Sequence, residues 1–373
     1  MNDMIAAGPA EIAVGTARAD LDTPALLVDL DVLTANIAAM AAVCRQAGVA
    51  WRPHTKGVKT PEIALMEVAA GAIGITCAKL GEAEVMAAGG IRDILIANQI
   101  VGPQKAKRLA ALLAVADVKT AVDSVENAQA LSAAMVAAGR RLKVLIEVDT
   151  GMQRAGVQPG AATVALAQAI AALPGLEFAG IMGWEAQCVA IADPAAKAAA
   201  IAEAIGRLTA SAAACTAVGL PCAIISCGGT GTFPMCAQQP GITEVQAGGG
   251  IFSDVLYRRI FKFDGPQALT VLATVTSRPT PTRIIFDAGK KTMSSDAAVP
   301  EAIGIAGVVA LKLSAEHGTI ELAAPSASPA IGEKVEMIVG YSDTTVHLHE
   351  TILAMRGGRV AAAWRVAGRG RLS

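Results

Sequence analysis

The sequence has few aromatic residues, few histidines and a small share of charged residues. Phe, Trp and Tyr make up 3% of the 373 residues, His occurs 4 times, and Asp, Glu, Lys and Arg together make up 17%. The net charge is −1, so no surplus of positive charge is available to bind the phosphates of a nucleic acid. Few aromatic rings are present on which bases could stack. These shortages predict that the protein has no nucleic-acid partner.

The cysteine pattern excludes further classes of protein. The number of cysteines is odd, and no two have the CxxC spacing of a zinc knuckle; they are Cys44, Cys77, Cys188, Cys215, Cys222, Cys227 and Cys236. Buried free thiols in a reducing cytosol are therefore expected, rather than a disulfide framework. Residues 1–18 lack the order of basic and then apolar residues of a signal peptide, and no uninterrupted apolar run could span a bilayer. We expect a cytoplasmic protein without a membrane partner.

The first two thirds of the chain alternate short apolar runs with Ala- and Leu-rich stretches. At 373 residues and 53% hydrophobic content, the chain is long enough for two domains. The alternation predicts an α/β fold, a (β/α)8 TIM-like barrel over residues 25–258. The expected strands are 25–28, 74–77, 94–97, 118–122, 143–148, 178–182, 223–226 and 244–247. An open doubly wound sheet is the alternative, although no dinucleotide fingerprint follows the first strand.

After about residue 260, runs that alternate apolar and polar residues replace the helical stretches. Gly, Pro and Asp turns separate these runs, which predicts a mostly β domain over residues 259–373. Residues 1–24 are expected to pair with it. The expected strands are 269–276, 283–287, 307–312, 318–322, 334–338, 345–349, 351–356 and 359–365.

Lys56 is the first candidate for chemistry. It follows the apolar passage 48–51 and the turn Arg52-Pro53, which places its amine at the C-terminal end of an expected barrel strand. Barrel enzymes hold their reacting groups at that end, and a lysine there can form a Schiff base with an aldehyde cofactor. The alternative is a solvated surface charge.

Two glycine-rich turns follow consecutive expected strands. The first is Ser226-Cys227-Gly228-Gly229-Thr230-Gly231-Thr232 and the second is Gly248-Gly249-Gly250. Backbone N–H groups without side chains around them can converge on an anion, and the loops after the last two strands form the usual phosphate site of this barrel. Arg154, in a loop after strand 143–148, adds a cation at the same mouth, or an ion pair that only closes it.

Together with segments 22–29, 147–157 and 243–248, these motifs resemble the D-threonine aldolase and D-serine dehydratase family of alanine-racemase-fold enzymes. The resemblance runs from about residue 22 to about residue 370. It implies pyridoxal 5'-phosphate (PLP) as the cofactor, a small amino-acid substrate and a homodimer. It also implies that the active site lies between the barrel of one subunit and the β domain of the other.

The resemblance also implies roles for individual residues. Lys56 would be the Schiff-base lysine and a base, with His54 packed beside the cofactor, and Arg154 would lie over the cofactor's phenolic oxygen. Trp184 and Gln187 would face the substrate. The other cofactor-binding residues would be Ser226, Gly228, Gly229, Thr230, Gly231, Gln246, Gly248 and Gly249.

The segment 339–350 departs from the family. There the family has a His-x-Asp or His-x-Cys metal pair; Asp343 keeps the second ligand, but Tyr341 replaces the histidine. Val58 stands where the family has another His, and Gly250 where an aromatic residue is common. On the expected strand, Asp343, His347 and His349 would share one face, so Asp343 and His347 are the candidate ligands for a divalent metal (Mn, Mg or Zn). They would lie roughly 13 Å apart unless the chain bends.

These residues suggest a PLP-dependent aldolase that cleaves D-β-hydroxy-α-amino acids, of the D-threonine or 3-hydroxy-D-aspartate type, to glycine and an aldehyde. The base would be His347, His349 or a water held by Asp343. One alternative is a dehydratase of D-serine or D-threo-3-hydroxyaspartate. Another is a metal-independent amino-acid racemase with Tyr341 as the acid/base on the opposite face. A PLP-binding homeostasis protein is the non-enzymatic alternative, and the extra β domain argues against it.

Overall fold

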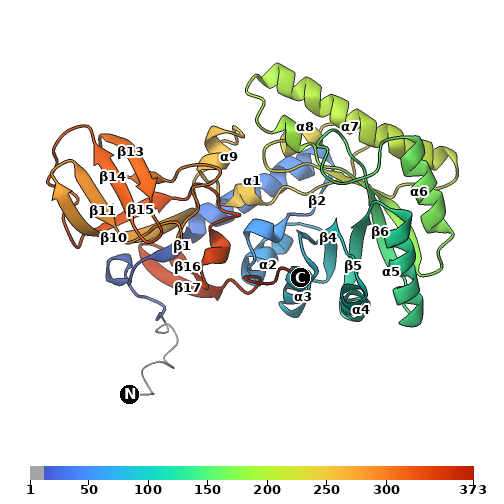
Figure 1. The fold of residues 1–373 in the computed structure, drawn as a ribbon, viewed down its shortest axis with the longest axis horizontal. Helices are drawn as coiled ribbons and strands as arrows, with labels where there is room; N and C mark the ends of the chain where they lie inside the picture. The colour runs from blue at the N-terminus through green and yellow to red at the C-terminus, as the bar shows by residue number, and fades with distance from the viewer. Residues whose placement is uncertain (1–11) are drawn as a thin grey trace, which may run out of the picture.

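Residues 12–373 are described by a computed structural model, in which a barrel of parallel strands and helices lies beside a mostly β domain (Figure 1). The barrel strands are β2 (Ala50–Trp51), β3 (Ile75–Cys77), β4 (Asp93–Gln99), β5 (Asp117–Val122), β6 (Leu142–Glu147), β7 (Leu176–Met182), β8 (Ile224–Cys227) and β9 (Glu244–Val245). They form a parallel sheet in the order β2-β9-β8-β7-β6-β5-β4-β3. The edge strands of this order are β2 and β3. The backbone N–H of Thr76 in β3 donates to Pro53 O (2.8 Å), and His54 and Thr76 form an isolated parallel β-bridge. The segment after β2 is thus joined to β3, which closes the barrel. The predicted (β/α)8 architecture is confirmed.

Helices alternate with the strands of this sheet. They are α1 (Leu30–Ala47), α2 (Pro61–Ala69), α3 (Leu80–Ala88), α4 (Pro103–Leu112), α5 (Val125–Ala137), α6 (Ala161–Ala171), α7 (Pro194–Ala217) and α8 (Phe233–Cys236). The last helix, α9 (Val255–Arg259), packs against the β domain, where Leu256 N donates to Gly340 O (3.0 Å). The sequence sets several of their ends. Asp29 caps α1 by accepting from Asp31 N and Val32 N, and Gly48 ends it with φ of 71°. Asp193 caps α7 by accepting from Ala196 N.

Helix α7 lies across one end of the barrel in Figure 1. Within the described part of the chain, it is the one helix long and apolar enough to cross a membrane by length and composition. It buries Ile201, Ile205 and Leu208, and it contacts β7, β8 and α6. Its hydrophobic residues therefore include those that pack it onto the barrel.

The strand expected at residues 25–28 belongs to the other sheet, so its assignment to the barrel was wrong. Strand β1 (Ala25–Asp29) pairs antiparallel with β10 and parallel with β16. Its central residues Leu26, Leu27 and Val28 are all buried. A strand that is buried on both faces shows no alternation, so its sequence pattern does not reveal which sheet it joins. The barrel begins instead with β2.

The β domain contains β10 (Leu269–Thr280), β11 (Arg283–Phe286), β12 (Glu301–Ile303), β13 (Val308–Leu313), β14 (Gly318–Leu322), β15 (Lys334–Ile338), β16 (Thr351–Arg356) and β17 (Arg359–Arg365). Its main path is β13-β14-β11-β10-β1-β16-β17, and β15 pairs with both β10 and β12. Near the N-terminus, Ala17 bridges Arg359. Residues 1–11, also expected to pair with this domain, lie outside the described residues.

The strand expected at residues 345–349 is absent. The chain forms turns there and then a 3₁₀ helix, η5 (Val346–Leu348). Alternation of apolar and polar residues over five positions also fits a turn in which the neighbours Thr345 and Val346 are buried. The premise that Asp343, His347 and His349 share one face of a strand was therefore wrong.

Arg52 lies inside the barrel, where its side chain is 2% exposed. Its Nε lies 3.1 and 3.0 Å from the two carboxylate oxygens of Glu244, and its Nη1 pairs with Asp93. Lys119 Nζ also reaches Asp93, at 2.9 Å. Glu244 and Asp93 begin their strands, so this network fills the barrel at the end opposite to the strand C-termini. Arg52 is thus part of a buried network of ion pairs. Removing Arg52 or one of its carboxylate partners would leave a buried charge without a partner of the opposite sign.

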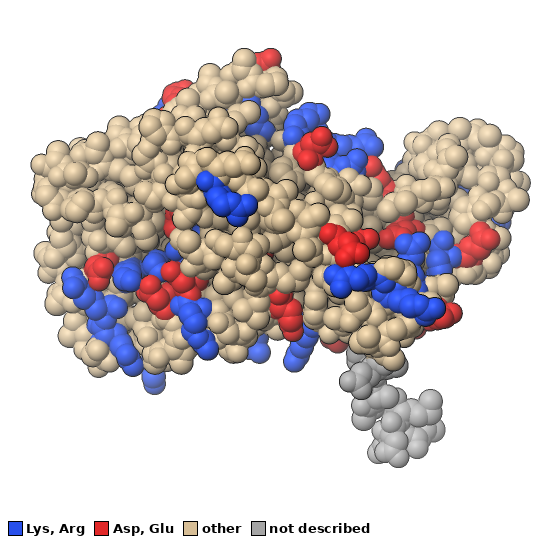
Figure 2. Space-filling model, turned by 180° about the vertical axis from the view of Figure 1, so that it is seen from behind, with Lys and Arg blue, Asp and Glu red and all other residues tan. Residues whose placement is uncertain are grey.

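Charges of both signs are mixed on the face of the molecule seen in Figure 2. Lys and Arg side chains lie beside Asp and Glu side chains there, and most of the area carries neither. This face therefore has mixed charges rather than separate basic and acidic areas. The absence of a nucleic-acid partner stays a prediction.

Candidate active site

The C-terminal ends of the barrel strands surround a cavity of ≈ 450 Å³. Parallel strands bring the residues that follow them to one end of a barrel, so residues far apart in the sequence meet there. From these loops come the lining residues His54, Lys56, Arg154, Trp184, Gly228, Gly229, Thr230, Gly231, Gln246, Gly248 and Gly249. The β-domain loop adds Tyr341, and α9 adds Tyr257. The structure therefore brings most of the predicted site residues together.

Lys56 lies in the 3₁₀ helix η2 (Thr55–Gly57), directly after β2. Its Nζ is 3.4 Å from Asp343 Oδ2 and 5.0 Å from the centre of the Trp184 ring, and its side chain is 35% exposed. The backbone N–H of Lys56 donates to His54 Nδ1 (3.3 Å). Burial, followed by the nearby charges of Lys56 and Lys59, lowers the pKa of His54 well below its usual value. His54 is therefore neutral at pH 7 and can accept this bond.

A buried carboxylate holds Arg154 at the cavity. Arg154 Nη2 is 3.5 Å from Glu147 Oε1, and its guanidinium carbon is 5.2 Å from the centre of the Trp184 ring. Gln99 Nε2 donates to the other oxygen of Glu147 (2.6 Å). The Arg154 guanidinium lines the cavity and also forms an ion pair with Glu147. The two interpretations of Arg154 from the sequence, a cation at the barrel mouth and an ion pair, therefore both describe it. The arrangement fixes a positive charge at one wall of the site.

The two glycine turns form a second wall with almost no side chains. A Cβ on Gly248 would lie 2.3 Å from the backbone oxygen of His54, and one on Gly249 would lie 2.1 Å from the Tyr257 hydroxyl. Gly250 N donates to Thr230 Oγ1 (3.0 Å), which ties the turns together. Within residues 12–373, no group accepts a hydrogen bond from the backbone N–H of Thr230 or Gly231. These N–H groups are free to bind an anion.

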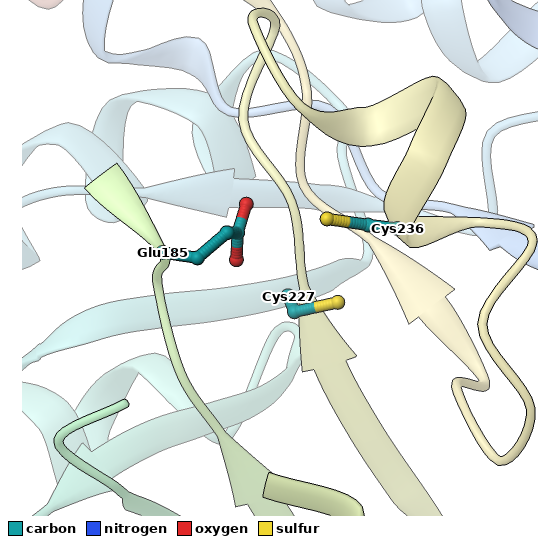
Figure 3. A group of neighbouring side chains, drawn as sticks. All are labelled: Glu185, Cys227 and Cys236. Atoms are coloured by element: carbon teal, nitrogen blue, oxygen red, sulfur yellow. The ribbon is translucent and has the colours of Figure 1, made fainter. Parts of the chain in front are cut away.

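Beneath the first turn, Glu185, Cys227 and Cys236 point toward one another from three segments (Figure 3). They are buried, and among the described residues they are the one group of three or more His, Cys, Asp or Glu side chains with metal-ligand spacing. The Glu185 carboxylate accepts from Gly228 N (3.3 Å) and from Thr232 Oγ1. The hydrogen bond with Cys227, together with burial, raises the pKa of the Cys236 thiol well above its usual value. Both thiols therefore stay protonated, and the hydrogen bonds that Glu185 accepts anchor the glycine turn.

The opposite wall of the cavity comes from the β domain. Tyr341 Oη donates to Asp343 Oδ2 (2.8 Å), and Tyr257 Oη donates more weakly to Asp343 Oδ1 (3.4 Å). Burial and then the charge of Asp343 raise the pKa of both phenols, that of Tyr257 well above its usual value. Both tyrosines are therefore neutral donors at pH 7, directed at one carboxylate that also faces Lys56.

Comparisons with known proteins agree with this arrangement. The family described as "Alanine racemase, N-terminal domain" matches residues 28–254, and the "Putative serine dehydratase domain" matches residues 268–355. The chain is 37% identical to a D-threonine aldolase of Arthrobacter sp, over 95% of both chains. It is 33% identical to a 3-hydroxy-D-aspartate aldolase of Paracoccus denitrificans (strain Pd 1222), over 96% of this chain and 94% of the relative. The crystal structure of a D-threonine aldolase from Filomicrobium marinum superposes with a TM-score of 0.93 at 35% identity, covering 97% of this chain and 99% of that one.

The chain belongs to the D-threonine aldolase and D-serine dehydratase family of alanine-racemase-fold enzymes. Membership of this family implies PLP as the cofactor. The cavity fits such a molecule. Lys56 presents an amine in it, and the glycine turns leave a hollow that side chains would fill. The unpaired N–H groups of Thr230 and Gly231 suit a phosphate.

Other predicted residues lie away from the cavity of this family member. Gln187 is exposed, and its Nε2 donates to Thr150 O (3.2 Å). Ser226 is buried behind the glycine turn, where its Oγ accepts from Gln246 Nε2 (2.8 Å). Neither lines the cavity. Ser226 can still act on the cofactor indirectly, because it holds Gln246, which does line it.

The two histidines of the β-domain loop also lie away from the lining. His349 Nε2 is 2.7 Å from Thr292 O, so one ring nitrogen already has a partner. His347 lies in η5, and its backbone oxygen accepts from Arg369 Nε (3.1 Å). Asp343 and His347 belong to none of the groups of three or more potential metal ligands in the described residues. The described residues thus place no third potential ligand of this kind beside the predicted pair, and the divalent metal stays a prediction.

Several lining residues were missed by sequence reasoning. Gln99 and Glu147 end β4 and β6, so their position at the ends of expected strands was a usable signal. Glu185, which anchors the glycine turn, follows β7 in the same way. Tyr257 follows no strand, and only the packing of α9 against the β domain brings it to Asp343.

Proposed function

We propose that this protein is a PLP-dependent carbon–carbon lyase that cleaves D-β-hydroxy-α-amino acids to glycine and an aldehyde. The supporting observation is that the amine of Lys56, the glycine turns and the phenol of Tyr341 line one cavity, in a chain that matches aldolases over nearly its whole length. D-Threonine and 3-hydroxy-D-aspartate are the substrate types, as the names of these relatives indicate. A homodimer stays a prediction from the resemblance.

The residues divide the work by position. Lys56 would hold the cofactor's aldehyde, and the N–H groups of Thr230 and Gly231 would hold its phosphate. When bound, PLP supplies an electron sink for the electron pair left on Cα when the Cα–Cβ bond breaks. Arg154 is fixed by Glu147 on one side of the cavity, and Trp184 covers both Arg154 and Lys56. These contacts orient the reacting groups in the cavity.

Dehydration is the second candidate, because the β domain matches a putative serine dehydratase domain over residues 268–355. In that reaction Lys56 would remove the α-proton, and the β-hydroxyl would leave as water. The two reactions begin from the same substrates but break different bonds. Their products therefore distinguish them without further assumptions.

The test is product analysis on purified protein loaded with PLP. D- and L-threonine, D-serine and the four stereoisomers of 3-hydroxyaspartate would be supplied separately. The proposal expects glycine and an aldehyde from D isomers and far slower cleavage of L isomers. Ammonia with a keto acid would establish the dehydratase, and inversion without cleavage would establish a racemase. Absence of any turnover would favour the PLP-binding homeostasis protein.

A further inference from the structure

The Asp343 carboxylate has the position expected of a metal ligand, but its surroundings are those of a proton-transfer group. Its two oxygens accept from Tyr341 Oη (2.8 Å) and Tyr257 Oη (3.4 Å), and Lys56 Nζ lies 3.4 Å from Oδ2. The side chain is 9% exposed. A Cβ on Gly57 would lie 2.3 Å from Asp343 Oδ1, so backbone packs tightly against that oxygen. A carboxylate has about four lone-pair sites, and this one already has three neighbouring donors.

Among the described residues, no group of three or more potential metal ligands includes Asp343. Tyr341 occupies the family's histidine position, and a neutral phenol is a weak ligand beside imidazole or carboxylate for Mn²⁺ or Zn²⁺. His349 Nε2 is already in contact with Thr292 O, and His347 lies outside the cavity lining. The donor set at this end of the cavity therefore does not fit a divalent ion.

Tyr341 and Tyr257 differ in what they can reach. Both line the cavity and both point at Asp343. The Tyr257 hydroxyl lies against the second glycine turn, where a Cβ on Gly249 would be 2.1 Å from it. Tyr341 makes the shorter bond to Asp343 and enters the cavity from the β domain. Tyr341 is thus the phenol available to a substrate hydroxyl.

We propose that Tyr341 takes the β-hydroxyl proton of the substrate and that Asp343 is a positioning residue that receives Tyr341's own proton, in place of a divalent ion. This inference rests on the proposed function. The substrate O–H bond breaks and its proton moves to Tyr341 Oη, while the phenolic proton moves to Asp343 Oδ2. The hydroxyl oxygen becomes the aldehyde oxygen, and the Cα–Cβ electron pair stays with the glycine half. Lys56 gives a proton to Cα, and the proton on Asp343 Oδ2 then moves to Lys56 Nζ, 3.4 Å away, so that Tyr341, Asp343 and Lys56 all return to their starting states.

The test uses PLP-loaded protein dialysed against a chelator. Aldehyde release from D-threonine would be measured with chelator and with added MnCl₂, and Mn²⁺ binding would be followed by calorimetry. Wild type is expected to keep its rate within about twofold in both conditions, since no proton step uses the ion. Tyr341→Phe is expected to lower kcat by about 10²- to 10⁴-fold, the usual contribution of a general acid–base group. Its KM and the visible absorbance of its bound cofactor should stay close to those of wild type.

Three further variants make the test specific. Tyr257→Phe keeps the ring and is expected to lose less than about tenfold in kcat, because its bond to Asp343 is long. Asp343→Asn should lower kcat nearly as far as Tyr341→Phe, with partial rescue by Asp343→Glu. Tyr341→His recreates the family's His-x-Asp pair, so this variant is expected to bind Mn²⁺ and to become sensitive to the chelator.

A wild-type rate that is lost in chelator and restored by MnCl₂ would overturn the inference and leave the aldolase intact. A Tyr341→Phe variant within about threefold of wild type would also overturn it, given the size expected for proton transfer. If wild type releases no aldehyde from any substrate, the proposed function fails and the proton relay fails with it.

Discussion

The mouth of the barrel and the β-domain loop 339–350 meet at one cavity, yet the two regions differ in how their sequences relate to their structures. At the barrel mouth, Lys56, Arg154 and the glycine turns lie where parallel strands must deliver them. In the loop, an expected strand is a 3₁₀ helix, and the expected metal pair is replaced by the contact of Tyr341 with Asp343. In the proposed function the barrel mouth holds the cofactor, and in the proposed proton relay the β-domain loop takes the proton from the substrate.

Lys56→Ala should have the largest effect on activity. It tests the role of the barrel mouth in cofactor binding, independently of the β-domain loop. Without the amine, the cofactor loses its covalent anchor, and activity should fall by at least about 10³-fold, together with the visible absorbance of bound PLP. Absorbance spectra and product assays would check this. Lys107→Ala, at an exposed position on α4, is the matched control and should behave like wild type. Retention of both signals in Lys56→Ala would place the anchor elsewhere.

Gly248→Ala should have the next largest effect. The added Cβ would lie 2.3 Å from His54 O and 2.6 Å from His54 N, both backbone atoms that cannot move aside easily. Overpacking of this kind costs about 1–3 kcal/mol, so PLP affinity should fall by about 10- to 100-fold. A fluorescence titration with PLP would measure the change.

Gly206→Ala is the control for that prediction. Position 206 lies within α7, and nothing lies within 4 Å of the Cβ that this variant would add. Alanine is the better helix former, so stability should rise by about 0.5–1 kcal/mol while PLP affinity stays the same. Equal loss of affinity in the two variants would show that the tight packing at Gly248 does not shape the cofactor site.

The sequence predicted the barrel and part of the site, but not the sheet to which β1 belongs or the contacts of Asp343. The barrel was predictable because apolar runs and helical stretches alternate, and Lys56 and the glycine turns could be placed because they follow those runs. The assignment of β1 failed because Leu26, Leu27 and Val28 are all buried. The contacts of Asp343 with Lys56 and Tyr257 depend on how the two domains pack, and no local pattern encodes that packing.

Replacement of Glu67 should have the smallest effect. It tests the thermal stability of the barrel rather than the chemistry of the site. It lies on α2 with no exposed area, and neither carboxyl oxygen has a hydrogen-bond partner among the described residues. Burial raises its pKa well above the usual value, so the folded state favours the neutral acid. Its contribution to stability is fully present below pH 4.5, the ordinary pKa of a glutamate in an unfolded chain, and is lost as the pH rises toward the raised pKa.

Glu67→Gln removes this titration because the amide is neutral at every pH. The Tm of the variant relative to wild type should therefore increase between pH 5 and pH 8, whatever its offset at pH 5. Thermal melts at a series of pH values would show the trend. A difference in Tm that stays constant with pH would mean that Glu67 is not held as the neutral acid.

The most direct test of the account is to locate the cofactor on the chain. PLP-loaded protein would be reduced with borohydride, which makes the link between lysine and cofactor permanent, and then digested and mapped by mass spectrometry. The account predicts a pyridoxyl group on Lys56, and much less labelling when D-threonine is added before reduction, because substrate displaces the lysine amine. Labelling of another lysine, or none at all, would contradict the assignment of the barrel mouth as the cofactor site.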